Sequence, residues 1–471
     1  MKKKKIIKSI FFTLFLLIPS FIYLLGVIID KSGLDVDKSR LSILKELFST
    51  EGRATVKKYI LPYNVISTQK QMIADLQELV LRFENNFFIL ESKFKESNTP
   101  ILTKKESNLK LSNNKILEKH SLYAGFYSGI KNVYPGSGYI DFYQNNLFIL
   151  SSRGVLAYKN KTEYEYTFKQ IKNNINNFIG VKQFKKDIGF SLKDLSFIND
   201  KIFISYTEEI KEDCWNTSII FGNINYENIQ FKKLFSSKEC VHKYNNIDKE
   251  FDPHQSGGRI FAFDDYNILL SVGEYRNRFL AQNEESVMGK ILKINIKNNN
   301  YQVISMGHRN PQGLYFDKEN NFILETEHGP FGGDEINLID TKKINKEKIQ
   351  NYGWPIVSAG EHYGAKARYN KKKYGKYPLY KSHSEYGYVE PLKSFVPSIG
   401  ISEIIKISKN KYVVSSLKDR SLYFFELNDE RKIINLERVE IYERIRDLKL
   451  NDNKLYLFLE DTSSIGIIEL N

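Results

Sequence analysis

Short runs of apolar residues recur along the chain from about residue 121 onward, and each follows a polar turn that contains Asn, Asp or Lys. The runs are rich in β-branched and aromatic residues and are only a few residues long, which favours strands over helices. Six of them stand out: Leu147–Leu150, Ile202–Ser205, Ile268–Ser271, Phe322–Glu325, Tyr412–Ser415 and Leu455–Phe458.

Several of these runs are followed by a turn and a second strand-like segment, namely Gly154–Tyr158, Gly289–Ile294, Ser421–Phe425 and Ile465–Ile468. Strand units that recur irregularly, about 45 to 90 residues apart, suit a β-propeller, whose blades are small antiparallel sheets and whose insertions lie in loops. Six units predict an all-β fold, a six-bladed propeller over residues 121–471. The Gly- and Tyr-rich stretch 351–388 lies in the widest gap, so we expect an elaborated loop there, at one mouth of the channel.

The first 30 residues have a different pattern. Lysines at positions 2 to 5 and at position 8 precede a nearly uninterrupted apolar run from Ile10 to Ile29. That length is close to the roughly 20 residues that cross a bilayer. The positive-inside bias then predicts that residues 1–30 form a transmembrane signal-anchor, with the propeller in the periplasm or otherwise outside the cytoplasm. A cleaved signal peptide is the alternative, but the run is long for one and no small-x-small cleavage site follows.

Residues 31–120 are expected to form a helical stalk and a polar linker. Apolar positions at helical spacing predict a helix over Gln69–Phe83, either as a free stalk or packed on the propeller. The stretch 91–114 is rich in Lys, Ser and Asn and contains Pro100, as is typical of a linker or surface loop.

Composition limits the partners. A hydrophobic content of 41% supports a sizeable core. The net charge of +14 comes from lysines scattered among Asn and Ile, without an arginine-rich stripe, so we expect no nucleic-acid partner. Cys214 and Cys240 are too few for a cysteine zinc site. They form either one disulfide or two separate buried thiols.

Candidate chemistry is densest in the run Gly307–Gly313, GHRNPQG. Arg309 and Asn310 can supply directed donors to carbonyl or carboxylate oxygens, with Gln312 beside them, while the flanking glycines let the backbone approach a ligand. A loop-stabilising Arg–Asp pair is the structural alternative.

A second motif covers Glu327–Glu335, EHGPFGGDE. The Gly329-Pro330 turn can direct consecutive backbone carbonyls at one point, and such oxygens are good calcium ligands. Nearby carboxylates at Glu327, Asp334 and Glu335 add to an oxygen-rich cation site. An ordinary turn between strands is the alternative.

Charged residues elsewhere in the chain complete the candidate set. Arg444 and Arg446 share one face at strand period, and with Lys418 they would supply three cations to a polyanionic ligand, although a solvated strand face is the alternative. His254 lies in a Gly-rich loop and is a candidate general base. Glu274 ends the third strand unit and adds a carboxylate.

Taken together, the motifs GHRNPQG, EHGPFGGDEINLI, NYGWP and RIRD resemble the glucose/sorbosone dehydrogenase family, which includes the soluble quinoprotein sugar dehydrogenases. The resemblance runs from about Gly189 to the C-terminus. It implies a six-bladed propeller that holds pyrroloquinoline quinone (PQQ) and calcium. By position, Arg309 and Asn310, with Gln312, would bind the quinone oxygens. Lys418, Arg444 and Arg446 would hold the PQQ carboxylates, and Gly329 and Pro330 would ligate calcium.

The resemblance also implies a reaction, the oxidation of an aldose sugar to its lactone. His254 would take the sugar hydroxyl proton while a hydride passes to PQQ beside Arg309, and Glu274 and Tyr363 would contact the sugar. Electrons would leave for an extracytoplasmic quinone or cytochrome. His254 lies five residues before Arg259, where the family usually has four. A propeller that binds sugar or PQQ without catalysis is therefore an alternative, and so is a calcium-dependent lactonase, which has no use for the three cations.

Overall fold

The computed structural model describes residues 71–77, 79, 100–101, 103–122, 137–160, 167–187, 189–344, 348–363 and 375–470. The chain divides into two compact units, Met1–Phe83 and Glu84–Asn471. In the first unit, residues 71–77 and 79 are helical, within the range of the predicted helix. The predicted membrane anchor, residues 1–30, lies outside the described residues. Within the described part, no helix is long and apolar enough to cross a membrane.

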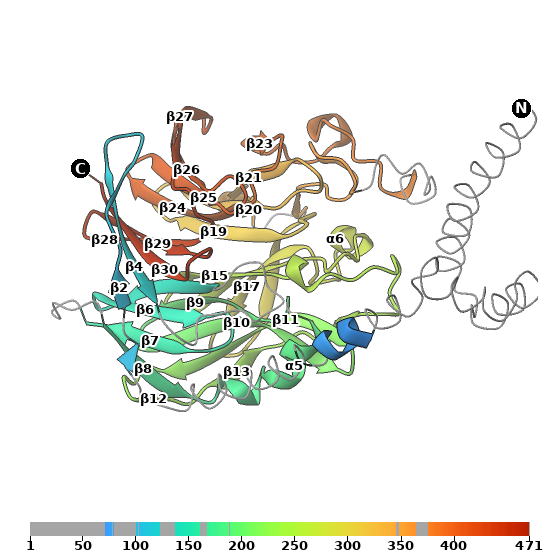
Figure 1. The fold of residues 1–471 in the computed structure, drawn as a ribbon. Helices are drawn as coiled ribbons and strands as arrows, with labels where there is room; N and C mark the ends of the chain where they lie inside the picture. The colour runs from blue at the N-terminus through green and yellow to red at the C-terminus, as the bar shows by residue number, and fades with distance from the viewer. Residues whose placement is uncertain are drawn as a thin grey trace, which may run out of the picture. The chain divides into compact units, whose positions relative to one another are not determined.

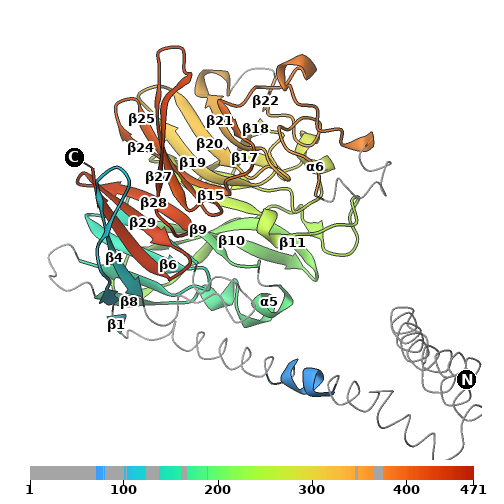
Figure 2. The same cartoon turned by 45° about the horizontal axis from the view of Figure 1, so that its top comes forward.

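The second unit folds into six sheets, which we call blades 1 to 6 (Figures 1 and 2). Their strands pair antiparallel, except for one short parallel pair in blade 1 and one in blade 3. Blade 1 contains β5 (Gly138–Tyr143), β6 (Asn146–Ser151), β7 (Leu156–Lys159), β8 (Phe168–Asn173) and the short β1 (Pro100–Ile101) and β12 (Asn228–Ile229). Blade 2 contains β9 (Leu192–Ile198), β10 (Lys201–Lys211), β11 (Cys214–Asn223), β13 (Lys232–Phe235) and β14 (Val241–His242). Blade 3 contains β15 (Gly257–Asp264), β16 (Asn267–Val272), β17 (Lys290–Asn295), β18 (Tyr301–Met306) and β22 (Gln350–Asn351).

The other three blades complete the ring. Blade 4 contains β19 (Pro311–Asp317), β20 (Phe322–Glu327), β21 (Asp334–Asp340) and β23 (Lys393–Phe395). Blade 5 contains β24 (Ile401–Ser408), β25 (Lys411–Ser416), β26 (Ser421–Leu427) and β27 (Ile433–Glu440). Blade 6 contains β28 (Ile445–Asn451), β29 (Lys454–Leu459), β30 (Ser464–Glu469), β4 (Ile116–Leu122), β2 (Thr103–Lys105) and β3 (Leu109–Lys110).

Helices are short and lie in the connections. They are α5 (Val181–Lys186), α6 (Phe279–Gln282) and the 3-10 turns η1 (Ile175–Asn177), η2 (Pro253–Gln255), η3 (Thr341–Lys343) and η4 (Ser384–Tyr386). The two cysteines form a disulfide between β11 and the segment before β14, with 5.4 Å between their Cα atoms. Of the two alternatives that the sequence left open, the structure therefore has the disulfide.

The first strand of each blade lines the centre of the molecule. These inner strands, β5, β9, β15, β19, β24 and β28, each contact the next one, and β28 contacts β5, so the ring is closed. The predicted six-bladed propeller is confirmed. Blade 6 is completed from the other end of the chain, because β4 pairs antiparallel with β30 and lies beside it in Figure 1. Strands β2, β3 and most of β4 fall within residues 31–120, where the sequence predicted a stalk and linker.

The core explains the apolar runs. All six predicted runs are second strands of blades, β6, β10, β16, β20, β25 and β29. Successive side chains of a strand point to opposite faces. In β6, Phe148 and Leu150 pack between blades 1 and 2, whereas Leu147 and Ile149 pack between blades 6 and 1. Both faces of a second strand are buried, so its sequence is continuously apolar instead of alternating.

Charged side chains join the inner strands across the central channel. Arg259 of β15 is 3% exposed, and its Nη1 lies 2.8 Å from Asp447, 2.9 Å from Glu403 and 3.0 Å from Asp194. These carboxylates belong to β28, β24 and β9. One guanidinium therefore connects the inner strands of four blades.

Candidate active site at one mouth of the propeller

The topology brings the predicted site residues to one mouth. Inner strands all begin at this mouth, and the antiparallel second strands return to it. Residues that precede an inner strand and residues that follow a second strand therefore meet there. The first group contains His254, Arg309, Asn310 and Arg444, with Gln312 and Arg446 at the strand starts; the second contains Glu274, Gly329, Pro330 and Lys418.

Arg309 is held in the wall of this mouth. Its side chain is buried, and Nη1 donates to the carbonyl oxygens of His328 at 2.8 Å and Gly329 at 2.7 Å. The guanidinium also lies 5.4 Å from the ring centre of Trp354 and 5.8 Å from that of Tyr363. Its partners are carbonyls and rings, so the alternative of an Arg–Asp loop pair is not what the structure has. Tyr363, itself 58% exposed, stands beside Arg309 at the solvent side.

Asn310 and Gln312 extend the wall toward blade 6. The side-chain oxygen of Asn310 accepts from the backbone N–H of Gly257 at 3.1 Å and from Gln312 Nε2 at 3.0 Å. Gln312 Oε1 in turn accepts from Arg446 Nη1 at 3.3 Å. A chain of hydrogen bonds thus connects blades 3, 4 and 6 across the mouth.

The predicted cations are placed differently from one another. Arg444 and Arg446 both contact one buried carboxylate, Glu460, at 2.8 Å each. Burial raises the pKa of Glu460, but the charges and hydrogen bonds of Arg446 and Arg444 outweigh it and bring the pKa to about 2, so Glu460 is ionised. The two guanidinium groups do share one face, as the strand period predicted. Lys418 is exposed at the mouth.

Glu274 is connected to Arg309 through a residue that the sequence did not single out. With its amide oriented to suit these partners, Gln255 donates to Glu274 Oε1 at 2.7 Å and accepts from Arg309 Nη2 at 3.0 Å and Arg276 Nε at 2.9 Å. Glu274 is fully buried, and its second oxygen has no partner among the described residues. Burial raises the pKa of Glu274 to about 7, against the opposing charges of Arg278 and Arg309.

His254 is exposed, with 62% of its side chain open to solvent. Its Nδ1 lies 3.2 Å from Asp252 Oδ1. Burial raises the pKa of Asp252, but the hydrogen bond and charge of His254 and the charge of Arg276 outweigh it and bring the pKa to about 2. An ionised carboxylate therefore orients the imidazole. No contact connects His254 directly to Arg309 among the described residues; Gln255, the next residue, makes that connection.

The Gly329-Pro330 turn does direct consecutive carbonyls at one point, as predicted, but the carbonyls are those of His328 and Gly329 and the point is Arg309 Nη1. The carbonyl of Pro330 instead accepts from Ser398 Oγ at 3.4 Å. Asp334 stabilises the turn, because its carboxylate accepts from the backbone N–H groups of Gly329, Gly400 and Ile401.

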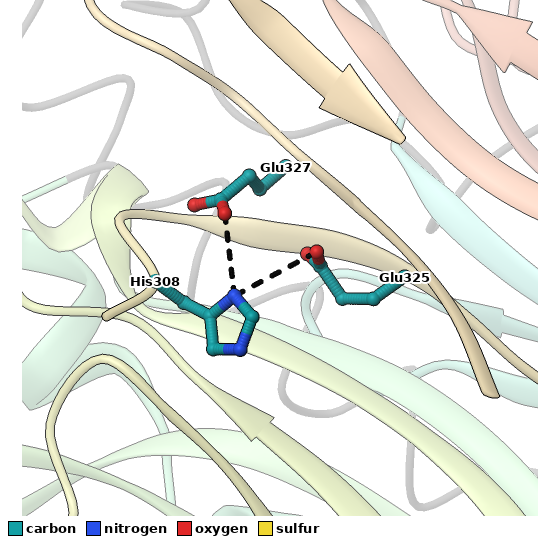
Figure 3. A group of neighbouring side chains, drawn as sticks. All are labelled: His308, Glu325 and Glu327. Carbon is teal, nitrogen blue, oxygen red and sulfur yellow. Dashed lines mark hydrogen bonds and ion pairs between the residues drawn. The ribbon is translucent and has the colours of Figure 1, made fainter. Parts of the chain in front are cut away.

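Behind Arg309 lies a buried acidic group. Figure 3 shows His308 facing Glu325 and Glu327, whose oxygens lie 3.7 Å and 3.2 Å from His308 Nδ1. The three side chains offer ligand atoms within 4.8 Å of one another and could hold a metal ion. Burial and the charge of Glu327 raise the pKa of Glu325 well above its ordinary value. Glu327 also accepts from the backbone N–H of Arg309, so this group fixes the Arg309 loop from below.

Sequence reasoning missed several members of the site: Gln255, His308, Glu325 and Glu460. Gln255 and His308 lie next to the candidates His254 and Arg309, and this adjacency is the only sequence feature that could have indicated them. Glu325 ends a predicted strand, and a strand residue by itself does not indicate a site. Glu460 carries no local signal, since it reaches the arginines only through the pairing of β28 with β29.

The fold and the mouth define a class, a six-bladed β-propeller whose polar loops gather where the inner strands begin. The family model for glucose/sorbosone dehydrogenase matches residues 193–468, which is more than half of the chain. The chain belongs to the glucose/sorbosone dehydrogenase family.

Individual relatives are distant. An uncharacterized protein of Synechocystis is 29% identical over 244 residues, 45% of this chain and 55% of that protein. Aldose sugar dehydrogenase YliI of Escherichia coli is 24% identical over 286 residues, 56% of this chain and 71% of that protein. The chain thus matches little more than half the length of the first of these relatives.

Solved structures with the same fold include the apo-form of soluble aldose sugar dehydrogenase from Escherichia coli, with a TM-score of 0.53 and 20% identity over 70% of this chain and 95% of that one. Another is the PQQ-bound form of aldose sugar dehydrogenase from Streptomyces coelicolor, with a TM-score of 0.52 and 16% identity over 79% and 99%. At these identities the likeness establishes the fold.

Proposed function

We propose that this mouth oxidises an aldose sugar to its lactone with PQQ and calcium. One observation carries the proposal, the hydrogen-bonded wall that runs from Asn310 through Gln312 to Arg446 beside the buried Arg309. Membership of the glucose/sorbosone dehydrogenase family supports it.

The donor set of the mouth fits a PQQ-like polyanion. Arg444 and Arg446 are oriented in advance by Glu460, and Lys418 is exposed nearby. A ligand with several carboxylates would gain charge-assisted hydrogen bonds from these cations. Arg309, Asn310 and Gln312 would hold the quinone end. When bound, PQQ supplies the hydride acceptor of the reaction.

Calcium would bind at the Gly329-Pro330 turn, whose backbone carbonyl oxygens are suitable ligands for a hard cation. It would supply positive charge beside the reacting oxygens. The carbonyl of Gly329 accepts from Arg309 Nη1 and that of Pro330 from Ser398 Oγ, so both carbonyls would have to exchange these donors for the ion.

The residues of the chain would have separate tasks. His254, oriented by Asp252, is the proposed acceptor of the sugar hydroxyl proton. Tyr363 offers an exposed ring to the sugar face, and Glu274 holds the Gln255–Arg309 side of the pocket in place. Electrons would pass to an acceptor outside the cytoplasm, near which the predicted anchor at residues 1–30 would keep the enzyme.

The test is turnover of an aldose panel by purified protein with PQQ, calcium and an artificial electron acceptor. We expect activity that is lost after calcium chelation and restored by calcium. Arg309→Gln should lower kcat/KM by roughly a hundredfold, because a positioned donor at the reacting oxygens is removed. Arg438→Gln, an exposed arginine paired with Asp419, is the matched control and should keep the activity.

A second candidate, a propeller that binds sugar or PQQ without catalysis, is favoured by one observation, the high exposure of His254. It predicts calorimetric binding of PQQ without acceptor reduction for any sugar. That result would refute the dehydrogenase proposal but would still support a PQQ-binding site at this mouth.

A further inference from the structure

The same mouth contains a lysine, Lys193, that has no role in the sequence motifs or in the proposed function. Lys193 lies near the start of inner strand β9 and is half-buried among groups from several blades. The charged groups that act on it electrostatically are Arg446 from blade 6, Arg153 from the turn after β6, Asp252 before η2 and Asp187 after α5. Lys193 therefore lies within the electrostatic field of this mouth.

Two glycines shape the space for Lys193. Gly258 has a φ of +113°, and a Cβ built there would lie 2.3 Å from Lys193 Cβ, so the lysine stem packs directly on this glycine. Lys193 Nζ donates to the carbonyl oxygen of Gly189 at 3.1 Å. A Cβ at Gly189 would lie 3.0 Å from His254 Nδ1, so the imidazole packs on the same residue. Lys193 and His254 thus both contact Gly189.

The surroundings disfavour the charged form of the amine. Burial lowers the pKa of Lys193 to about 7, and the positive charges of Arg446 and Arg153 act in the same direction, against Asp252 and Asp187. A substantial fraction of the side chain is then a neutral amine at pH 7. An amine in that range is suited to accept a proton.

We propose that Lys193 is a second proton acceptor of this mouth, able to take the hydroxyl proton of the substrate alongside His254. The inference rests on the proposed function. The substrate O–H bond breaks and its proton goes to Lys193 Nζ, which becomes an ammonium. Bound PQQ would supply the acceptor for the hydride that the adjacent C–H bond gives up with both electrons as a C=O bond forms. The half-exposed ammonium then returns its proton to solvent.

Substitutions separate this role from that of a cation for an anionic ligand. Lys193→Arg keeps a permanent positive charge but cannot accept a proton at working pH, whereas Lys193→Met removes both properties. We expect both variants to lose at least roughly tenfold in kcat/KM, as for a general base. We also expect the double variant with His254→Asn to lose more than either single variant. The control Lys411→Met, at an exposed lysine paired with Glu426, should match the wild type.

The pH profile supplies a second readout. In the His254→Asn variant, Lys193 remains the titrating acceptor, so kcat/KM should rise with pH through about 7, and that limb should vanish when Lys193→Arg is added. Full activity of Lys193→Arg, with a loss in Lys193→Met and weaker PQQ binding, would overturn the inference and assign Lys193 as a cation for the cofactor.

A measurement without cofactor keeps the inference apart from the proposed function. After reductive methylation with 13C-formaldehyde, the lysine resonance that is absent in Lys193→Arg should titrate near pH 7, far below the value of about 10 for exposed lysines. A titration above about 9 would overturn the inference even if the enzyme is active. If no sugar is oxidised but the resonance titrates near 7, the proposed function fails and the neutral amine stands.

Discussion

Glu274 and Asp252 lie at the same mouth, yet their environments move their pKa values in opposite directions. Burial holds Glu274 near 7, whereas His254 and Arg276 hold Asp252 near 2 despite burial. Pairs of groups whose pKa values are pushed apart are typical of acid–base sites. The two carboxylates therefore differ in protonation across the neutral range.

The raised pKa of Glu274 makes stability depend on pH. Its folded value of about 7 exceeds its ordinary value of 4.5, so its stabilising contribution is complete below pH 4.5 and is lost as the pH rises through 7. Glu274→Gln cannot ionise and should lack this loss. Urea unfolding measures this. From pH 5 to pH 8, the free energy of unfolding of the wild type should fall by about 2 to 3 kcal/mol more than that of the variant. Parallel decreases in the two proteins would contradict the assignment.

At the residue scale, the sequence predicted the members of the site better than their partners. Arg309, Asn310 and Gln312 belong to one local run, and Arg444 and Arg446 share a face by strand period. Glu460 and Lys193 reach the mouth only through strand pairing and ring closure. A local pattern carries no information on such contacts.

At the element scale, the second strands were predictable because both of their faces are buried. Strand β4 was not, since its sequence ILEKHSL has four consecutive polar residues and its partner β30 lies more than 300 residues away. Its burial pattern shows the reason: Leu117 is 2% exposed and packs between blades 5 and 6, while Ile116 is 47% exposed.

Closure by β4 can be tested with this neighbouring pair. Leu117→Ala should lower the free energy of unfolding by about 2 to 4 kcal/mol, because it opens a cavity where the two ends of the propeller meet. Ile116→Ala, on the solvent side of the same strand, should change it by less than about 1 kcal/mol. Equal effects of the two substitutions in thermal or urea unfolding would mean that β4 does not close the ring in solution.

At the scale of the whole molecule, Arg259 joins parts that no single sheet connects. Three carboxylates from blades 2, 5 and 6 surround its guanidinium in the channel. Burial raises the pKa of Glu403 to about 8 and that of Asp194 to about 6, even though Arg259 opposes both shifts. The channel therefore holds Arg259, with the charge of Lys449 also acting on these carboxylates, among acidic groups that are already costly to ionise.

Replacing Arg259 with Met should lower the free energy of unfolding by roughly 3 to 5 kcal/mol at pH 8, because it leaves three buried carboxylates without the guanidinium that contacts them. Without Arg259, the folded-state pKa values of Asp194 and Glu403 rise further. The difference in unfolding free energy between wild type and Arg259→Met should then shrink as the pH falls and these groups take up protons. Urea unfolding at pH 5 and pH 8 checks this. Arg438→Met removes an exposed pair with Asp419 and should cost about 1 kcal/mol or less at both values. An Arg259→Met deficit that is independent of pH would mean that packing, and not charge, holds the blades together at the channel.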